Sequence, residues 1–194
     1  MKSRNLLLLL ALWPFLLTAQ RSYDPVKYKP ASVCMSSDEK ELYDLVMKYR
    51  KEKGLPSIPV SRSLTYVAQL HVWDLATNSP ETATCNMHSW SAKGPWKQVC
   101  YTDDHKKAEL MWSKPKELTK YTGNGYEIAC MSSNMSPSEA LNCWHGSPAH
   151  NNVILNIGIW SQKWNAVGIG MMDNYAVIWF GNDPDSENAP LVCP

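Results

Sequence analysis

Apolar residues recur at helical spacing in two stretches of the first half of the chain. In residues 37–54 the apolar positions fall on one face of a helix, which is preceded by serines that can cap it and stopped by Gly54. Residues 61–78 repeat the pattern, and their apolar stripe includes His71. A histidine within such a stripe is typical of a core or edge position, so we interpret His71 as structural rather than as a ligand.

The second half of the chain predicts a small sheet. The segment GYEIACMSS, residues 125–133, indicates a strand, and SPSEALNCW, residues 136–144, indicates a helix capped by Ser136. The apolar runs 164–172 and 175–181 are joined by a short polar turn, which is typical of an antiparallel hairpin. Helices that flank a small, mostly antiparallel sheet indicate the α+β class, arranged as an α-β-α sandwich.

Residues 78–125 are long, polar and irregular, apart from AELMW at 108–112, which predicts a helical turn. A connection of this length is expected to be either stapled or functional. It contains Cys85, Cys100 and several tryptophans. We therefore predict a disulfide-stapled segment that packs against the core.

The chain begins MKSRNLLLLLALWPFLLTAQ, in which a short positive region precedes an apolar run and a small residue. This pattern is typical of a secretory signal peptide over residues 1–20. Pro14 interrupts the apolar run, which is shorter than the roughly 20 residues of a membrane span. We predict an exported protein, secreted or periplasmic, with an extended lead-in at 21–36 and a single domain at 37–194.

An even set of six cysteines in an exported chain predicts three disulfides. These residues are Cys34, Cys85, Cys100, Cys130, Cys143 and Cys193. The sequence does not select among the fifteen possible pairings, although a Cys34–Cys193 bridge would tie the two ends together. The formal net charge is +1 and no basic stripe is present, so no nucleic-acid partner is expected. No second long apolar segment follows, and we expect a monomer without a membrane span.

Three residues outside the apolar stripes could form a site: His88 in NMHSW, Glu127 in GYEIA and His150 in SPAHNN. Two imidazoles and a carboxylate are a suitable ligand set for a divalent metal such as zinc. The same groups could instead form an acid/base cluster. Their spacing matches no helical metal motif, so the residues alone leave both interpretations open.

Five segments follow one another along the chain: LTYVAQLHVWDLA, MHSW, GYEIA, WHGSPAHNNVI and AVGIGMM with YAVIWFG. In this order they resemble the CAP superfamily, which comprises cysteine-rich secretory proteins, antigen 5 and plant pathogenesis-related proteins. The similarity runs from about Asp38 to Gly181, and the WHGSPAHNNVI segment is similar to the bacterial-type branch. The resemblance implies an α-β-α sandwich with a central cleft, and a lineage-specific insertion over residues 91–125 that either lines the cleft rim or covers the core.

The family's cleft holds two histidines and two acids, and the resemblance assigns His88, Glu127 and His150 to three of these positions. Ser147 stands where the second acid is usual, and Tyr126 precedes the glutamate. Ser147, Tyr126 and Ser89 are therefore expected to line the cleft. Two histidines and one carboxylate would leave an open coordination position, so we expect a divalent ion, Zn²⁺, to bind with reduced affinity.

Three functions follow from these features. The resemblance implies a secreted binding protein whose cleft holds a metal ion and a small or apolar ligand, lipid or protein. A metal-assisted hydrolase would use Glu127 or a cleft histidine to activate water, and Ser89 or Ser147 could be proposed as a nucleophile. The third is a structural extracellular module in which the polar cluster only holds the cleft together. We expect the binding protein, with no catalytic residue assigned.

Overall fold

The computed structural model describes residues 24–27 and 29–194, and the predicted signal peptide at residues 1–20 lies outside them. At its centre is a three-stranded antiparallel sheet in the order β2-β4-β3. The strands are β2 (Gly125–Met131), β3 (Ala166–Met172) and β4 (Tyr175–Gly181). The β3–β4 hairpin turns at Asp173, whose φ of 51° lies in the left-handed region typical of such turns.

One face of the sheet is covered by α2 (Arg62–Asn78), which lies directly on β3. Two glycines permit this close approach. A Cβ at Gly168 would lie 2.0 Å from the backbone carbon of Leu64, and one at Gly170 would lie 2.5 Å from that of Ala68. The apolar side of α2 and alternate strand residues such as Trp179 form the first core cluster.

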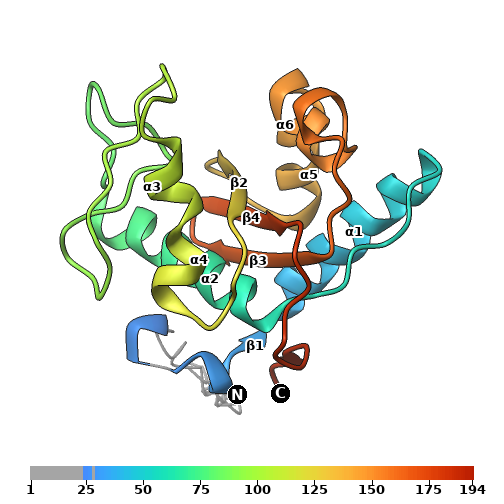
Figure 1. The fold of residues 1–194 in the computed structure, drawn as a ribbon, viewed down its shortest axis with the longest axis horizontal. Coiled ribbons are helices and arrows are strands. Elements are labelled where there is room, and N and C mark those ends of the chain that lie inside the picture. The colour runs from blue at the N-terminus through green and yellow to red at the C-terminus, as the bar shows by residue number, and fades with distance from the viewer. Residues whose placement is uncertain (1–23, 28) are drawn as a thin grey trace, which may run out of the picture.

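The opposite face carries α1 (Ser37–Glu52), α5 (Pro137–His145) and α6 (Pro148–Ile154) (Figure 1). The strand residues that alternate with those of the first cluster, Ile178 among them, point into this second core. The two cores confirm the predicted α+β class and the layers of an α-β-α sandwich.

The predicted insertion is stapled and packed, as expected. Cys85 and Cys100 form a disulfide, and a β-bridge pairs Trp90 with Val99. Two short helices follow, α3 (Ala108–Trp112) and α4 (Lys114–Leu118). The Lys114 side chain has no exposed surface. Its buried charge is compensated, because the ammonium donates to Glu117 at 2.9 Å and lies 5.3 Å from the Trp90 ring centroid. This insertion forms one lobe of the molecule beside α2.

The two ends of the described chain meet at the bottom of Figure 1. Two short strands, β1 (Cys34–Met35) and β5 (Leu191–Val192), pair in parallel. The Cys34–Cys193 disulfide joins them, which confirms that predicted bridge, and Cys130–Cys143 is the third disulfide. The lead-in before β1 contains two 3-10 turns, η1 (Pro25–Lys27) and η2 (Pro30–Ser32), where the sequence predicted extended chain.

The predicted helices and hairpin are confirmed, and so are the serine caps predicted for α1 and α5; the cap of α2 was not predicted. Ser36 caps α1 in a full capping box with Glu39, Ser61 caps α2 and Ser136 caps α5. The sequence did not predict α4, α6 or the 3-10 helix η3 (Gly158–Trp160). These elements are short, so too few apolar positions recur to show a helical period. None of the helices within residues 24–27 and 29–194 is long and apolar enough to cross a membrane.

Candidate functional site

Glu127 is the centre of a buried polar cluster that includes His71. Both side chains have no exposed surface. Nδ1 of His71 contacts Oε2 of Glu127, and Nε2 of His71 lies 3.0 Å from the carbonyl oxygen of Ser89. The ring of His71 also stacks on Trp90, with centroids 4.4 Å apart and an interplanar angle of 7°. The helix α2 and the strand β2 therefore meet through an ion pair beneath the insertion.

The contacts of His71 determine its protonation. A carbonyl oxygen only accepts hydrogen bonds, so Nε2 carries a proton. When His71 is an imidazolium, its Nδ1 also carries a proton and donates it to the Glu127 carboxylate. Burial alone lowers the pKa of His71, but the charge and hydrogen bond of Glu127 outweigh it and raise that pKa. Burial likewise raises the pKa of Glu127, yet the charge of His71 and its hydrogen bonds lower it overall. The pair is thus charged, and the stacked indole stabilises the cation.

His88 approaches the same carboxylate from the insertion side. Its Nδ1 lies 2.8 Å from Oε1 of Glu127, and 21% of its side chain remains exposed. Because Nδ1–H donates to the carboxylate, the imidazole orientation is fixed. Nε2 of His88 has no hydrogen-bond partner within the described residues. The Glu127 carboxylate is therefore shared between two histidines, and one of them presents a free nitrogen.

His150 belongs to α6, and the charges of His88 and Glu127 both act on its imidazole. Burial, followed by the charge of His88, lowers its pKa, while Glu127 has the opposite effect. Nδ1 of His150 is buried without a hydrogen-bond partner in the part of the chain that the structure describes. Ser147, at the position of the missing acid, caps α6 by accepting from the His150 amide at 3.5 Å. The Ser-Pro-Ala segment thus starts a helix.

The other predicted cleft residues have structural partners. The hydroxyl of Ser89 accepts from the Tyr101 amide at 2.9 Å and is fully buried. Tyr126 points to the opposite face of β2 from Glu127, because neighbouring strand residues alternate. There its ring lies 5.2 Å from that of Trp112 on α3 and 5.3 Å from that of Trp160 on η3. This aromatic row joins the insertion to the α6 side of the molecule.

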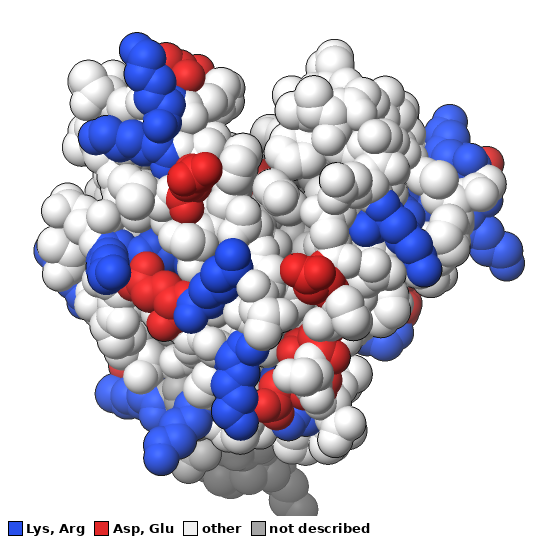
Figure 2. Space-filling view, in the orientation of Figure 1, with Lys and Arg blue, Asp and Glu red and all other residues white. Residues whose placement is uncertain are grey.

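A notch separates two lobes above the sheet (Figure 2). Comparison with Figure 1 places the insertion on one side and α5 and α6 on the other. The insertion lobe carries charges of both signs, whereas residues 140–162 contain no Asp, Glu, Lys or Arg. Ile157 and Ile159 are exposed by 47% and 88% on the uncharged lobe. One side of the notch is therefore formed by a lobe without charged side chains in residues 140–162.

The predicted metal set is not assembled as three ligands. Within residues 24–27 and 29–194, no group of three or more His, Cys, Asp or Glu side chains is placed to hold a metal ion. Both oxygens of Glu127 already accept from histidines. The available donors are one nitrogen of His88 and the imidazole of His150. His88 and His150 together offer two side chains, so they do not fit a closed structural zinc site, which needs four protein ligands. Glu127 orients the His88 ring through the contact at Nδ1.

Comparison with known proteins identifies the family of the chain. The family model described as CAP, the Cysteine-rich secretory protein family, matches residues 43–177, which include His71, His88, Glu127 and His150. The chain belongs to the CAP family. No curated protein matches this CAP-family chain.

Solved structures resemble this CAP domain at low identity. An extracellular SCP-domain protein of Bacillus anthracis has a TM-score of 0.54 and 18% identity, over 75% of this chain and 40% of its own. An outer surface protein of Borrelia burgdorferi has a TM-score of 0.49 and 22% identity, over 74% of this chain and 91% of its own. A cysteine-rich secretory protein of Staphylococcus aureus has a TM-score of 0.48 and 18% identity, over 82% of this chain and 40% of its own. The Bacillus structure supports the fold, and this chain spans about 40% of the length of two of these proteins.

Sequence reasoning missed the role of His71 in this CAP site. Its interpretation as a buried helix residue is confirmed, since the side chain is fully buried. However, a buried imidazole needs partners for both ring nitrogens, and a buried carboxylate needs a cation. That requirement was the signal that could have paired His71 with Glu127.

Proposed function

We propose that this protein is a secreted CAP-domain binding protein whose cleft takes a small ligand at His88 and His150. The observation that carries the proposal is the buried Nδ1 of His150, which has no partner within the described residues. A buried polar atom without a hydrogen bond costs about 1–3 kcal/mol. A bound ligand or ion that supplied the missing partner would recover that free energy.

The rest of the cluster is organised to present nitrogen lone pairs. The Glu127 carboxylate fixes the ring of His88 through Nδ1, at 2.8 Å. The lowered pKa of His150, caused first by burial, keeps its imidazole neutral. Neutral imidazoles accept hydrogen bonds and also bind divalent metals. A metal would take His88 and His150 as ligands, and Glu127 would set the orientation and basicity of His88 through its hydrogen bond with Nδ1.

The decisive test is calorimetric titration of Zn²⁺ into the oxidised mature protein. We expect saturable binding that is lost in His88→Ala and in His150→Ala. His145→Ala is the matched control, because His145 is an exposed histidine on the neighbouring helix α5. Equal zinc binding by all three variants would contradict the metal role. No binding heat with folded wild-type protein would leave the cluster as a structural anchor.

Export is part of the same proposal. The signal-like residues 1–20 support it, and so do the three disulfides, which persist in oxidising compartments. N-terminal sequencing of the protein recovered from a secreting host should find that mature chains begin near residue 20. An intact Met1 on the recovered protein would contradict export through a cleaved signal.

A hydrolase is the second candidate, and the orientation of His88 by a buried carboxylate is the observation that favours it. This is how a general base is commonly held. The hydroxyls of Ser89 and Ser147 are already used, at Tyr101 and at the α6 cap, so water would have to be the nucleophile. Ester and peptide substrates should then be hydrolysed by the wild type, and Glu127→Gln should slow the reaction more than His145→Ala does.

A further inference from the structure

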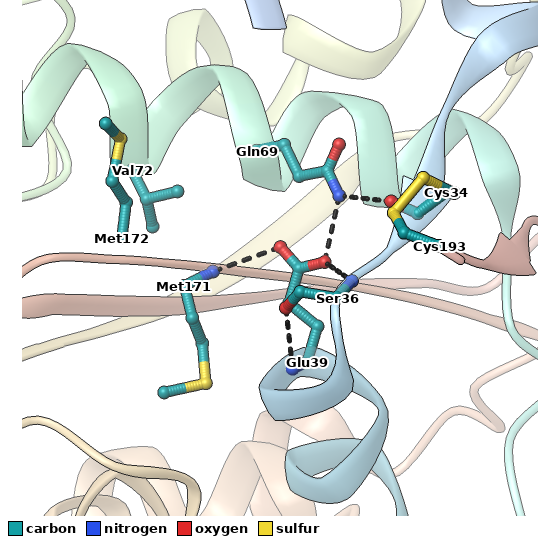
Figure 3. Close-up of a pocket in the computed structure, with 8 residues that line it drawn as sticks. All are labelled: Cys34, Ser36, Glu39, Gln69, Val72, Met171, Met172 and Cys193. Atoms are coloured by element: carbon teal, nitrogen blue, oxygen red, sulfur yellow. Dashed lines mark hydrogen bonds between the residues drawn. A yellow bond between two sulfur atoms is a disulfide. The ribbon is translucent and has the colours of Figure 1, made fainter. Parts of the chain in front are cut away.

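A cavity lies where β1, α1, α2 and the end of β3 meet, and none of its lining residues belongs to the His88–Glu127–His150 cluster (Figure 3). Its volume is about 160 Å³. The walls are mainly apolar: Val72 of α2, Met171 and Met172 of β3, and the Cys34–Cys193 disulfide. A cavity of roughly 150 Å³ with apolar walls holds a molecule the size of benzene.

The polar part of this cavity is the carboxylate of Glu39, which is 2% exposed. Its Oε2 accepts from the amide of Ser36 at 2.8 Å and from Nε2 of Gln69 at 2.9 Å. Its Oε1 accepts from the amide of Met171 at 3.2 Å. Figure 3 shows the carboxylate between Met171 and Ser36, with Gln69 reaching toward it from α2. A carboxylate offers about four lone-pair sites, and the hydrogen bonds from Ser36, Gln69 and Met171 occupy three of them.

Glu39 has no cationic partner among the described residues. Its hydrogen-bond partners Ser36, Gln69 and Met171 are neutral donors. Burial raises the pKa of Glu39 to about 7, against the opposing effect of the hydrogen bonds from Ser36, Gln69 and Met171. A buried carboxylate is stabilised in its charged form by a nearby cation. The cavity therefore combines apolar walls with one carboxyl group that has no ion-pair partner among the described residues.

We propose that this cavity binds a small primary amine, with the ammonium group donating to Oε1 of Glu39. The apolar body of the amine packs against the methionines, Val72 and the disulfide. Thioether and disulfide sulfur atoms are polarisable and adapt to different ring or chain shapes. The carboxylate selects for the positive charge, and the cavity volume limits the body to about the size of one six-membered ring. This site is independent of the His88–His150 cleft.

Benzylamine is a suitable probe, because it carries one ammonium group on a ring of the right size. Benzyl alcohol is the neutral control of the same shape. By titration calorimetry of the oxidised mature protein at pH 7, we expect benzylamine to bind at least tenfold more tightly than benzyl alcohol. Binding should also release protons, since the ammonium favours the charged form of Glu39. Repeating the titration in buffers of different ionisation enthalpy measures that release.

Three variants localise the site. Glu39→Gln should remove the preference for the amine and the proton release; glutamine still suits this capping-box position. Met172→Trp should fill the cavity and weaken both probes at least tenfold. Met172 is partly exposed and packs at the edge of the first core cluster, so a larger side chain can be accommodated better there than at a fully buried position. Met131→Trp is the matched control, because Met131 is 55% exposed on β2 and outside the cavity.

The outcomes separate clearly. Equal affinities for benzylamine and benzyl alcohol would overturn recognition of the charge. Binding that survives Met172→Trp would overturn the location, and so would a loss in Met131→Trp as large as in Met172→Trp. Absence of benzylamine binding to the folded wild-type protein would overturn the site altogether. None of these results depends on whether zinc binds in the cleft.

Discussion

Replacing His71 by phenylalanine should be among the most damaging single changes in the site. The aromatic ring can still stack on Trp90, so the packing is largely retained. The change removes the proton donors to Glu127 and to the Ser89 carbonyl. Glu127 then keeps only His88 as a partner while its side chain stays fully buried. Breaking one side of a buried ion pair typically costs about 3–5 kcal/mol, because an uncompensated charge remains.

Glu127→Gln should cost much less, about 1 kcal/mol, and this contrast tests the reasoning. The glutamine amide can donate to Nδ1 of a neutral His71, and its oxygen can still accept from His88. Nε2 of His71 continues to donate to Ser89. Every hydrogen bond then has a partner, so no buried group is left unsatisfied. The double variant His71→Phe with Glu127→Gln should be more stable than His71→Phe alone, since it no longer buries a charge.

The cost of His71→Phe should also depend on pH. The pKa of His71 is raised, so its contribution to stability is complete below about 6.5, the unfolded value, and is lost as pH rises through the folded value. The pKa of Glu127 is lowered, so its contribution is complete above about 4.3 and is lost as pH falls through its folded value. The pair therefore contributes most between about pH 4.3 and 6.5.

Urea denaturation followed by tryptophan fluorescence measures these differences, since Trp90 stacks on the replaced ring. We expect the free energy of unfolding to fall by about 3–5 kcal/mol in His71→Phe at pH 5.5. A loss below about 1 kcal/mol there, or an equal loss in Glu127→Gln, would refute the buried ion pair.

Three further predictions concern stability. Gly168→Ala should destabilise the protein severely and lower the yield of folded material, because the new Cβ would lie 2.0 Å from the Leu64 backbone; thermal melting of this variant beside Gly146→Ala, where the nearest atom is 3.3 Å away, checks this. Protonation of Glu39 should contribute about 3 kcal/mol of stability that is present near pH 4.5 and lost as pH rises to about 7, because its folded pKa is about 7 and the folded state binds the extra proton. In urea titrations across this range the wild type should therefore lose about 3 kcal/mol more than Glu39→Gln does, and equal slopes for the two proteins would contradict the assignment. Replacing Cys34 and Cys193 together by serine should cost up to about 5 kcal/mol, since the bridge closes a loop with a separation of 159 residues; an unchanged melting temperature would show that the β1–β5 pairing holds the ends without it.

Local sequence patterns were sufficient for the main secondary structure. Helix α1 could be predicted from Ser36 with Glu39, because a capping box needs only residues three apart in the chain. The β3–β4 hairpin was predictable for the same reason, since its turn and its alternation are local. Helix α6 was not predicted, because its seven residues complete too few turns to show a period.

The CAP-like motifs by themselves singled out His88, Glu127 and His150; in the structure His88 contacts Glu127, and the charges of both act on His150. Only the tertiary structure decided how they pair. Glu127 is held by His71 from one side of the sheet and by His88 from the insertion, so its oxygens are used before any metal arrives. The same is true of Glu39, whose capping role was predictable but whose place in a cavity depends on Met171 and Cys193, 132 and 154 residues away in the chain. A helical or strand period depends on neighbours in the chain, whereas the partners of a buried charge come from whichever elements the fold brings together. Burial makes such partners necessary, and no local pattern identifies them.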